Sequence, residues 1–184
     1  MDNHWPAPLA CAVALIVSAC TNGDKLPPTP SIAPRPAPNF SIQTIDGKPL
    51  NSANLKGKIV LLNFWSVWSP TCAREIPDLR QLRDSFDNGQ EHIAIVGICV
   101  ESNNLDDLAS FMQEIGIDYP VSLQENDFAG PFGGIDAIPS TFVIDPGWNI
   151  VNRYTGKIFL KELRYELEYL LEKIEAEKAA GEQR

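Results

Sequence analysis

The sequence FWSVWSPTCAREIP runs from Phe64 to Pro77 and joins an apolar segment, residues 59–63, to the beginning of a helical pattern. Cys72 lies near that helix start, where unpaired backbone N–H groups and the helix dipole favour a thiolate. The residue three positions earlier is Ser69. Two cysteines at this spacing would form and break a disulfide. A serine hydroxyl cannot replace a thiolate, so the two-electron dithiol cycle cannot run within this segment.

The segment resembles the active site of thioredoxin-fold proteins, in which Trp-Cys-x-x-Cys lies at a strand-to-helix turn, with Ser69 in the place of the first cysteine. Its continuation through Arg74, Glu75 and Pro77 is similar to the Cys-x-x-Glu-x-Pro pattern of the TlpA/ResA-like branch. That branch consists of membrane-tethered periplasmic thiol reductases. The resemblance therefore implies a redox protein that lacks the outer thiol of its motif.

Other regions extend the resemblance. Residues 40–48 (FSIQTIDGK) and 55–58 (LKGK) are similar to the opening hairpin of the branch and to the lead-in to its first core strand. Residues 137–145 (AIPSTFVID) are similar to its Gly-Val-Pro-Thr-Thr-Phe-Leu-Ile-Asp segment, whose proline is cis and lies against the active-site cysteines. The match extends over residues 38–175. It implies an α/β, thioredoxin-like three-layer fold, with a central mixed sheet flanked by helices and an N-terminal β-hairpin extension.

The resemblance also implies roles for individual residues. In the branch, the glutamate that corresponds to Glu75 is buried beside the cysteines and tunes their proton transfers; a helix-face carboxylate stabilised by the N-terminal dipole is the alternative. Trp65 and Trp68 would form an apolar platform for the substrate, although core packing alone would explain Trp65. The implied catalytic residues are Cys72, Ser69, Glu75 and Pro139, and the implied substrate-binding residues are Trp65, Trp68, Pro70 and Ile138.

The four cysteines divide between an N-terminal segment and the expected domain. Cys11 and Cys20 belong to the first, and Cys72 and Cys99 belong to the second. Cys99 lies in a buried-strand pattern, residues 92–100, that would neighbour the strand before the active-site helix. A buried inert thiol is the first prediction for Cys99. A resolving thiol that pairs with Cys72 in an exported, disulfide-permitting compartment is the alternative, and the Cα distance would decide between them.

The N-terminal segment predicts export. Residues 8–19 (PLACAVALIVSA) are too few to span a bilayer, which needs about 20 apolar residues, and fit the core of a secretory signal. Residues 17–20 (VSAC) resemble a bacterial lipobox, so Cys20 would become the lipidated first residue of the mature chain. Residues 1–5 depart from the pattern because they carry no Lys or Arg. An ordinary cleaved signal and an uncleaved anchor are the alternatives to a periplasm-facing, membrane-anchored lipoprotein of a bacterium.

A proline-rich segment follows the signal. Six of the fifteen residues 24–38 are prolines, which favour extended polyproline II and would hold the domain up to about 45 Å from the membrane. The predicted organisation is a lipoprotein-type signal peptide (1–19), a Pro-rich tether (20–37), a thioredoxin-like domain (38–178) and a flexible tail (179–184).

Within the domain, apolar periodicity predicts alternating helices and strands. The active-site helix is expected to continue to Phe86, and a second helix to begin at Asn103 and end at Gly116. The remaining expected elements are a strand over 119–123, a hairpin of 141–144 with 149–154, and a last helix over 159–178. Leucines at three-four spacing in that last helix would also suit a coiled-coil seam, but packing on the sheet and a monomeric protein are predicted.

Composition excludes several classes of function. The 184-residue chain, with 44% hydrophobic and 21% charged residues, is typical of one globular domain. A formal net charge of −9 without a basic cluster argues against nucleic acid as a partner. The only histidines are His4 and His92, and no cluster has metal-ligand spacing, so neither a metal, a cofactor nor a Ser-His-Asp hydrolase is expected.

Three functional interpretations stay open at this point. The favoured one is a thiol-disulfide oxidoreductase relative that acts through Cys72 on periplasmic protein thiols or disulfides, with a membrane electron donor and a lipid anchor. The second is a peroxidase, because residues 69–72 (SPTC) also resemble the Thr/Ser-x-x-Cys of peroxiredoxins; the proline upstream of that motif is absent. The third is a non-catalytic binding module that keeps the groove beside Pro139. An engineered Cys-to-Ser substitution at position 69 would give the same sequence.

Overall fold

The computed structural model describes residues 28–86, 91–102, 104–124 and 127–182. The strands of its large sheet are β1 (Arg35–Pro36), β4 (Ile59–Ser66), β5 (Ile93–Glu101), β6 (Val121–Leu123), β7 (Ser140–Ile144) and β8 (Asn149–Thr155). A separate hairpin consists of β2 (Ser41–Gln43) and β3 (Pro49–Asn51). The helices are α1 (Pro70–Asp84), α2 (Leu105–Ile115) and α3 (Leu160–Glu182), with the short 3-10 helices η1 (Ser52–Leu55) and η2 (Gly130–Phe132).

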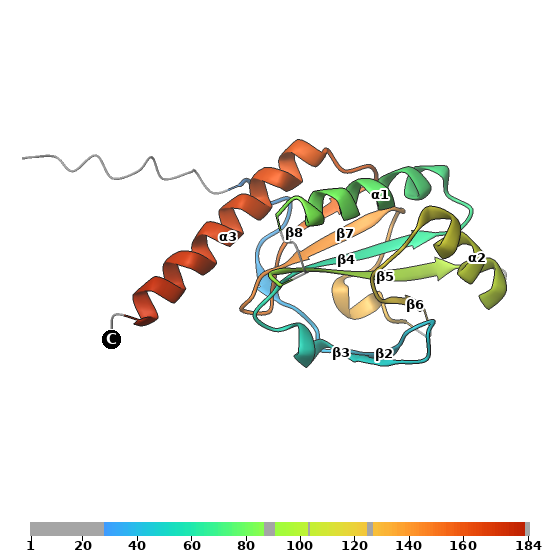
Figure 1. Ribbon diagram of the computed structural model, residues 1–184, viewed down its shortest axis with the longest axis horizontal. Coiled ribbons are helices and arrows are strands. Elements are labelled where there is room, and N and C mark those ends of the chain that lie inside the picture. Colours follow the sequence, from blue (N-terminus) through green and yellow to red (C-terminus); the bar gives the residue numbers. More distant parts are fainter. Residues whose placement is uncertain (1–27, 87–90, 103, 125–126, 183–184) are drawn as a thin grey trace, which may run out of the picture.

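The six strands of the large sheet follow the order β1-β8-β7-β4-β5-β6 (Figure 1). The pairs β4–β5 and β5–β6 are parallel, whereas β7 runs antiparallel to both β4 and β8. β4 therefore lies in the middle of a mixed sheet, and α1 follows directly from its carboxyl end. The segment between β4 and α1 therefore lies at the end of the sheet where the parallel strands β4, β5 and β6 have their carboxyl ends.

Alternation along β4 divides the interior into two cores. Ile59 and Leu61 point to the face that carries the helices, whereas Val60 and Leu62 point to the opposite face. Successive side chains of a strand lie on opposite faces, so an almost wholly apolar strand requires that both faces of the sheet be covered. The burial of every β4 residue agrees with this requirement.

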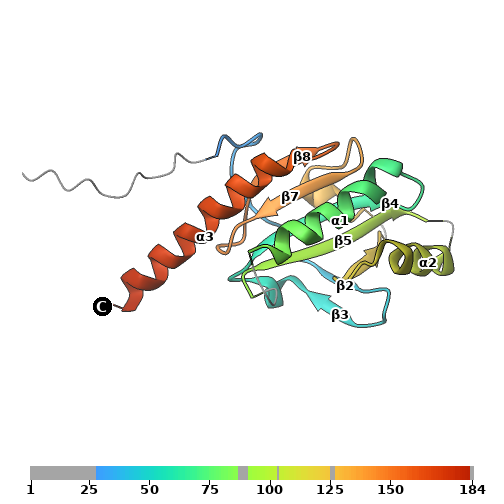
Figure 2. The ribbon, with the colours of Figure 1, turned by 45° about the horizontal axis from the view of Figure 1, so that its top comes forward.

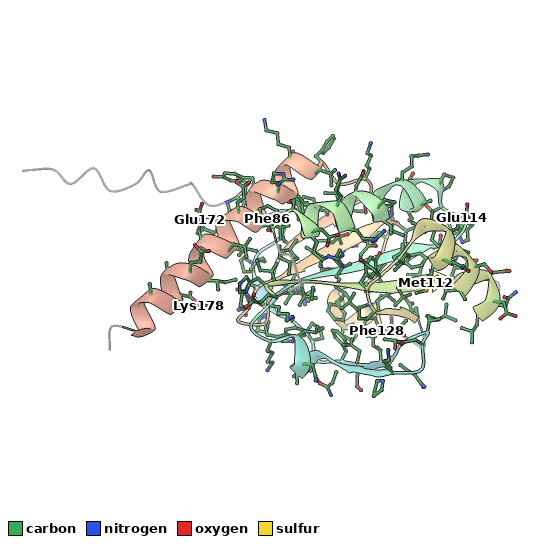
Figure 3. The ribbon with its side chains drawn as sticks, in the orientation of Figure 1. Phe86, Met112, Glu114, Phe128, Glu172 and Lys178 are labelled. Atoms are coloured by element: carbon green, nitrogen blue, oxygen red, sulfur yellow. The ribbon has the colours of Figure 1, made fainter. Side chains whose placement is uncertain are left out.

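All three α-helices cover the same face of the sheet, through residues such as Leu79, Leu108 and Leu163 (Figures 1 and 2). Figure 3 shows Phe86 where the end of α1 meets α3, and the Arg164 guanidinium lies 5.1 Å from the centre of that ring. Aliphatic and aromatic packing thus holds α1 against both the sheet and the last helix. The C-terminal half of α3 extends beyond the sheet (Figure 2).

The opposite face is covered by the β2–β3 hairpin, the N-terminal segment and η2. Phe40, Phe128 and Phe132 form an aromatic cluster there, with ring centroids 5.5–6.4 Å apart, and Figure 3 shows Phe128 on this side of the sheet. The predicted three-layer α/β thioredoxin-like fold with an N-terminal hairpin is therefore confirmed. Its helices lie on one face, and the hairpin with η2 forms the other layer.

The sheet begins inside the segment that the sequence predicts as a tether (20–37). Arg35 and Pro36 pair with β8 as the edge strand β1. Further upstream, the backbone N–H and the hydroxyl of Ser31 both donate to Oδ1 of Asn152, each at 2.8 Å. An edge strand tolerates prolines because one side of its backbone needs no ladder hydrogen bonds. The predicted tether is thus docked on the domain from Ser31 onward.

The helix ends also differ from the expected ones. α2 has Asn104 as its N-cap, with Oδ1 accepting from the Asp107 N–H at 2.8 Å, and Asn103 lies outside the described residues. α3 continues to Glu182, so most of the segment predicted as a flexible tail (179–184) is helical. The predicted signal peptide (1–19) and Cys20 lie outside the described residues, and none of the described helices is long and apolar enough to cross a bilayer.

Candidate active site

The turn between β4 and α1 places a serine and a cysteine at the start of the helix. Ser69 is the N-cap, and its Oγ accepts from the Cys72 backbone N–H at 3.3 Å. Pro70 occupies the first position of the helix, where its missing N–H costs nothing and its fixed φ suits the helix. Ser69 takes the place of the outer thiol of the motif, and together with Pro70 it forms a favourable helix start.

The Cys72 side chain is fully buried between α1 and the sheet. Burial raises the pKa of its thiol, and the negative charge of Glu75 raises it further. The Ser69 hydroxyl and the backbone N–H groups of Ser66 and Cys72 act in the opposite direction and lower this pKa. Burial has the largest effect, so the thiol of Cys72 is protonated at neutral pH.

Glu75 lies one helical turn after Cys72 and is also buried. Its Oε2 accepts from the Ile158 N–H at 2.8 Å, and its Oε1 has no hydrogen-bond partner among the described residues. Burial raises the pKa of this carboxyl to about 7, Asp78 adds to the shift, and the Ile158 N–H, Asn63 and Lys157 lower it. A small cavity of about 110 Å³ reaches Glu75 between α1 and the start of α3. The carboxyl therefore changes its charge near neutral pH beside a thiol.

Asn63 and Thr141 form a polar pair that the sequence-based site prediction omitted. They are directly opposite each other on β4 and β7, and Asn63 Nδ2 donates to Thr141 Oγ1 at 2.8 Å. Both are buried, and Asn63 also acts on the Glu75 carboxyl. The signal in the sequence was a single amide inside the apolar run of β4. Since β4 positions alternate between faces, that amide had to lie on the side of α1.

A groove lies on the surface between the segment that follows β4 and the segment that precedes β7. It has a volume of about 400 Å³ and is lined by Trp68, Ile138, Val100, Gln124, Asp127, Ala129, Gly134, Ile135, Asp136 and Ala137. The peptide bond between Ile138 and Pro139 is cis, and Pro139 itself is buried. Trp68 is 59% exposed, and its Nε1 donates to Oε2 of Glu101 at 3.0 Å. The structure therefore brings Trp68 and Ile138 together in one groove, and the cis proline follows Ile138 directly in the chain.

Trp65 does not belong to this groove, which corrects its expected role as part of a substrate platform. Its indole is fully buried and stacks on Phe111 of α2, with centroids 5.3 Å apart. Gly97 lies on the neighbouring strand β5, and a Cβ at that position would lie 2.8 Å from the indole nitrogen. Trp65 is therefore a core residue. Pro70 is exposed at the helix start rather than in the groove lining.

Cys99 lies opposite Trp65 in the parallel pair β4–β5 and points into the helix-side core. Its thiol donates to the Glu101 carbonyl at 3.2 Å. Burial raises the pKa of Cys99 to about 11, and the Val67 N–H lowers it in part. Cys99 and Cys72 are both free thiols in this structure. Across the described residues, no group of three or more His, Cys, Asp or Glu side chains is arranged to hold a metal ion.

Comparison with known proteins identifies the family of this chain and several of its relatives. The family model of the AhpC/TSA family matches residues 34–153. The thiol-disulfide oxidoreductase ResA of Bacillus subtilis (strain 168) is 31% identical over 120 residues, which are 65% of this chain and 65% of that protein. ResA of Bacillus thuringiensis (strain Al Hakam) is 27% identical over 138 residues, which are 75% of this chain and 76% of that protein.

A solved structure shows the same architecture. The crystal structure of a thiol:disulfide interchange protein of the thioredoxin family from Chlorobium tepidum TLS superposes with a TM-score of 0.67 at 36% sequence identity. The match covers 76% of this chain and 98% of that one. The chain therefore belongs to the AhpC/TSA family, within the ResA-like branch of the thioredoxin superfamily of thiol-disulfide oxidoreductases.

Proposed function

We propose that this protein is an exported thiol-disulfide oxidoreductase that acts through Cys72 as the one thiol of a Ser-x-x-Cys site. The observation that carries the proposal is the pair of buried residues Cys72 and Glu75, one helical turn apart at the start of α1 that Ser69 caps. A buried carboxyl with a pKa of about 7, one helical turn from a thiol, is suited to accept the proton of that thiol.

The proposed reaction begins with loss of the Cys72 proton to Glu75, whose carboxylate form is available above pH 7. The resulting thiolate attacks one sulfur of a partner's disulfide, a Cys72–partner disulfide forms, and the partner's other sulfur leaves as a thiolate that takes up a proton. Because Cys72 is fully buried, the turn at Ser69 must open before this attack. Slow exchange is the expected consequence.

The partner would dock as an extended segment in the groove beside Ile138 and Pro139. The exposed Trp68 supplies an apolar face for it, held in place by its hydrogen bond to Glu101. The partners are periplasmic protein thiols or disulfides and a membrane electron donor. Export and lipidation at Cys20 are supported by the residues 17–20, and residues 20–30 would connect the lipid to the domain.

A peroxidase is the second candidate, and one contact favours it: the Ser69 hydroxyl accepts from the Cys72 N–H and lowers the pKa of the Cys72 thiol. Peroxide reduction requires an accessible thiolate, and Cys72 is neither accessible nor of low pKa. Burial of Cys72 limits both reactions, and the groove lined by Trp68 and Ile138, which would hold a protein partner, favours thiol-disulfide exchange over peroxide reduction.

A peroxide pulse separates these functions. Full-length protein is exposed briefly to low peroxide, and Cys72 is then examined by mass spectrometry, with Cys72→Ser as the control. We expect no sulfenic acid at Cys72, slow reaction with a bulky alkylating reagent, and Cys72-dependent mixed disulfides in cells. Rapid sulfenic acid formation at Cys72 would establish the peroxidase instead. Absence of both products would leave the non-catalytic binding module as the function.

A further inference from the structure

The two buried cysteines point into one region of the helix-side core. Cys99 shares the face of β5 that carries Ile93 and Ile95, and Cys72 faces the same core from the first turn of α1. The strand partner of Cys99 is Trp65, the residue just before the turn that leads to α1. The fold therefore brings together two thiols that are 27 positions apart in the sequence.

Hydrogen bonds of the turn link the backbone around the two thiols: the Ser69 N–H donates to the Ser66 carbonyl at 3.4 Å, and the Ser69 Oγ accepts from the Cys72 N–H at 3.3 Å. The Ser66 N–H acts on the sulfur of Cys72, and the Val67 N–H acts on the sulfur of Cys99. These two N–H groups belong to consecutive residues, whose nitrogens are no more than about 4 Å apart. The charge of a Cys72 thiolate also acts directly on Cys99. Ser66, which follows Trp65 in β4, is thus connected to Cys72 through Ser69, and Trp65 is the strand partner of Cys99.

We propose that Cys99 is the resolving thiol of this protein and forms an internal Cys72–Cys99 disulfide, in place of the Cys-x-x-Cys disulfide that Ser69 precludes. The inference rests on the proposed function, because it begins from the mixed disulfide between Cys72 and a partner. It assigns Cys99 a chemical role that the motif alone does not indicate.

The electron and proton balance is complete with a partner disulfide as oxidant. The Cys99 sulfur attacks the Cys72 sulfur of the mixed disulfide, the Cys72–partner bond breaks, and the Cys72–Cys99 bond forms. The proton of the Cys99 thiol ends on the departing partner sulfur. Over the cycle, the two cysteines lose two electrons and two protons, and the partner's disulfide becomes two thiols.

The surroundings of Cys99 suit this restricted role. Like Cys72, it is fully buried and lies outside the groove lining, so neither thiol meets a partner until the turn at Ser69 opens, and Cys72 is the thiol that follows directly on that turn. Its thiol is held by the Glu101 carbonyl, and the side chain of the same residue holds Trp68 at the groove. Movement of Trp68 as a partner docks would therefore be transmitted to the residue that restrains the Cys99 thiol.

The test uses the reduced full-length chain and Ellman's reagent, a small aromatic disulfide. After reaction, trypsin separates Cys72 in residues 59–74 from Cys99 in residues 84–153. We expect these two peptides to be joined by a disulfide. The released thionitrobenzoate, after subtraction of the amount released by Cys72→Ser, should be about two per chain. In Cys99→Ser and Cys99→Ala, we expect about half that release and a stable adduct on Cys72.

The possible results distinguish failure of this inference from failure of the proposed function. A lasting Cys72 adduct in the unsubstituted protein, without joined peptides, would overturn the role of Cys99 and leave Cys72 as a one-thiol site. No reaction at Cys72 in any of these proteins would overturn both proposals. The joined peptides are detected in the unsubstituted protein, so the result does not depend on how well the Cys99 variants fold.

Discussion

Glu75 and Glu166 are buried carboxyls on two helices of the same face, and burial raises the pKa of both. Glu166 is satisfied by two donors: Asn152 Nδ2 at 3.1 Å and the Tyr154 hydroxyl at 2.8 Å both reach its Oε2. Glu75 has one backbone donor and an oxygen without a partner among the described residues, and it lies beside a thiol and a small cavity.

Two equally buried carboxyls can therefore have different roles, depending on the groups that surround them. The Glu166 network extends through Asn152 to Ser31 and so ties α3, β8 and the N-terminal segment together. Its groups restrain one another, as expected of a structural network. The Glu75 carboxyl is less restrained and titrates next to Cys72, as expected of a group that exchanges protons.

Replacing Ser69 by cysteine should give the largest change. Ser69→Cys restores two thiols at the helix start, where the outer one is stabilised as a thiolate, so the introduced thiol should form a disulfide with Cys72. Turnover of insulin disulfides should rise from background to a readily measured rate. Glu166→Gln in the same background should leave that rate unchanged. Two free thiols under oxidising conditions, with no turnover, would show that the site around Glu75 lacks the geometry of its relatives.

Glu75 should matter for the activity that Ser69→Cys creates. Glu75→Gln in that background should lower kcat/KM by about 100-fold, since an amide cannot accept the Cys72 proton. The pH profile should also lose its rise through pH 7, the range in which Glu75 becomes charged. Stopped-flow kinetics at several pH values measure both effects. An unchanged pH profile would assign Glu75 to the same structural class as Glu166.

Removing Glu166 should instead affect stability. Glu166→Ala leaves the Asn152 amide and the Tyr154 hydroxyl without their buried acceptor, and it should lower the free energy of unfolding by about 3–4 kcal/mol. Urea denaturation measures this loss. Glu166→Gln keeps an acceptor oxygen and serves as the matched control with a smaller loss. Equal stability of the alanine variant and the unsubstituted protein would contradict a structural role for the network.

The pH dependence of stability should reveal Glu75. Its pKa is raised by folding from 4.5 to about 7, so it contributes stability below pH 4.5 that is lost as the pH rises through 7. Relative to Glu75→Gln, the unsubstituted protein should therefore lose about 2 kcal/mol between pH 5 and pH 8. Taking the difference between the two proteins cancels the titration of Glu166. A difference that is independent of pH would refute the raised pKa.

Trp68 should have the smallest effect, because it is an exposed residue at the groove. In the Ser69→Cys background, Trp68→Ala should raise KM for a protein substrate about fivefold, roughly 1 kcal/mol, and leave kcat nearly unchanged. The exposed Phe159, which is outside the groove lining, offers a matched control as Phe159→Ala. A loss of equal size in both variants would mean that the groove does not select the substrate.

Much of this fold was accessible from the sequence because its signals are local. The apolar run of β4, the N-terminal hairpin and the turn between β7 and β8 each lie within about ten residues, so their pattern needs no distant partner. The tether and tail were less predictable. Whether Arg35–Pro36 pairs with β8 depends on a strand edge in the last third of the chain, and proline composition alone favours an unpaired chain.

The site divides in the same way. Spacings along the chain are sufficient to place Cys72 and Ser69 at a helix start, Glu75 one turn later and Pro139 before a core strand. The stacking of Trp65 on Phe111, the hydrogen bond between Asn63 and Thr141, and the core that Cys99 shares with Cys72 arise only when the chain folds. Those contacts join separate elements, and burial and side-chain proximity across a sheet are fixed only when the strands pair and the helices cover them.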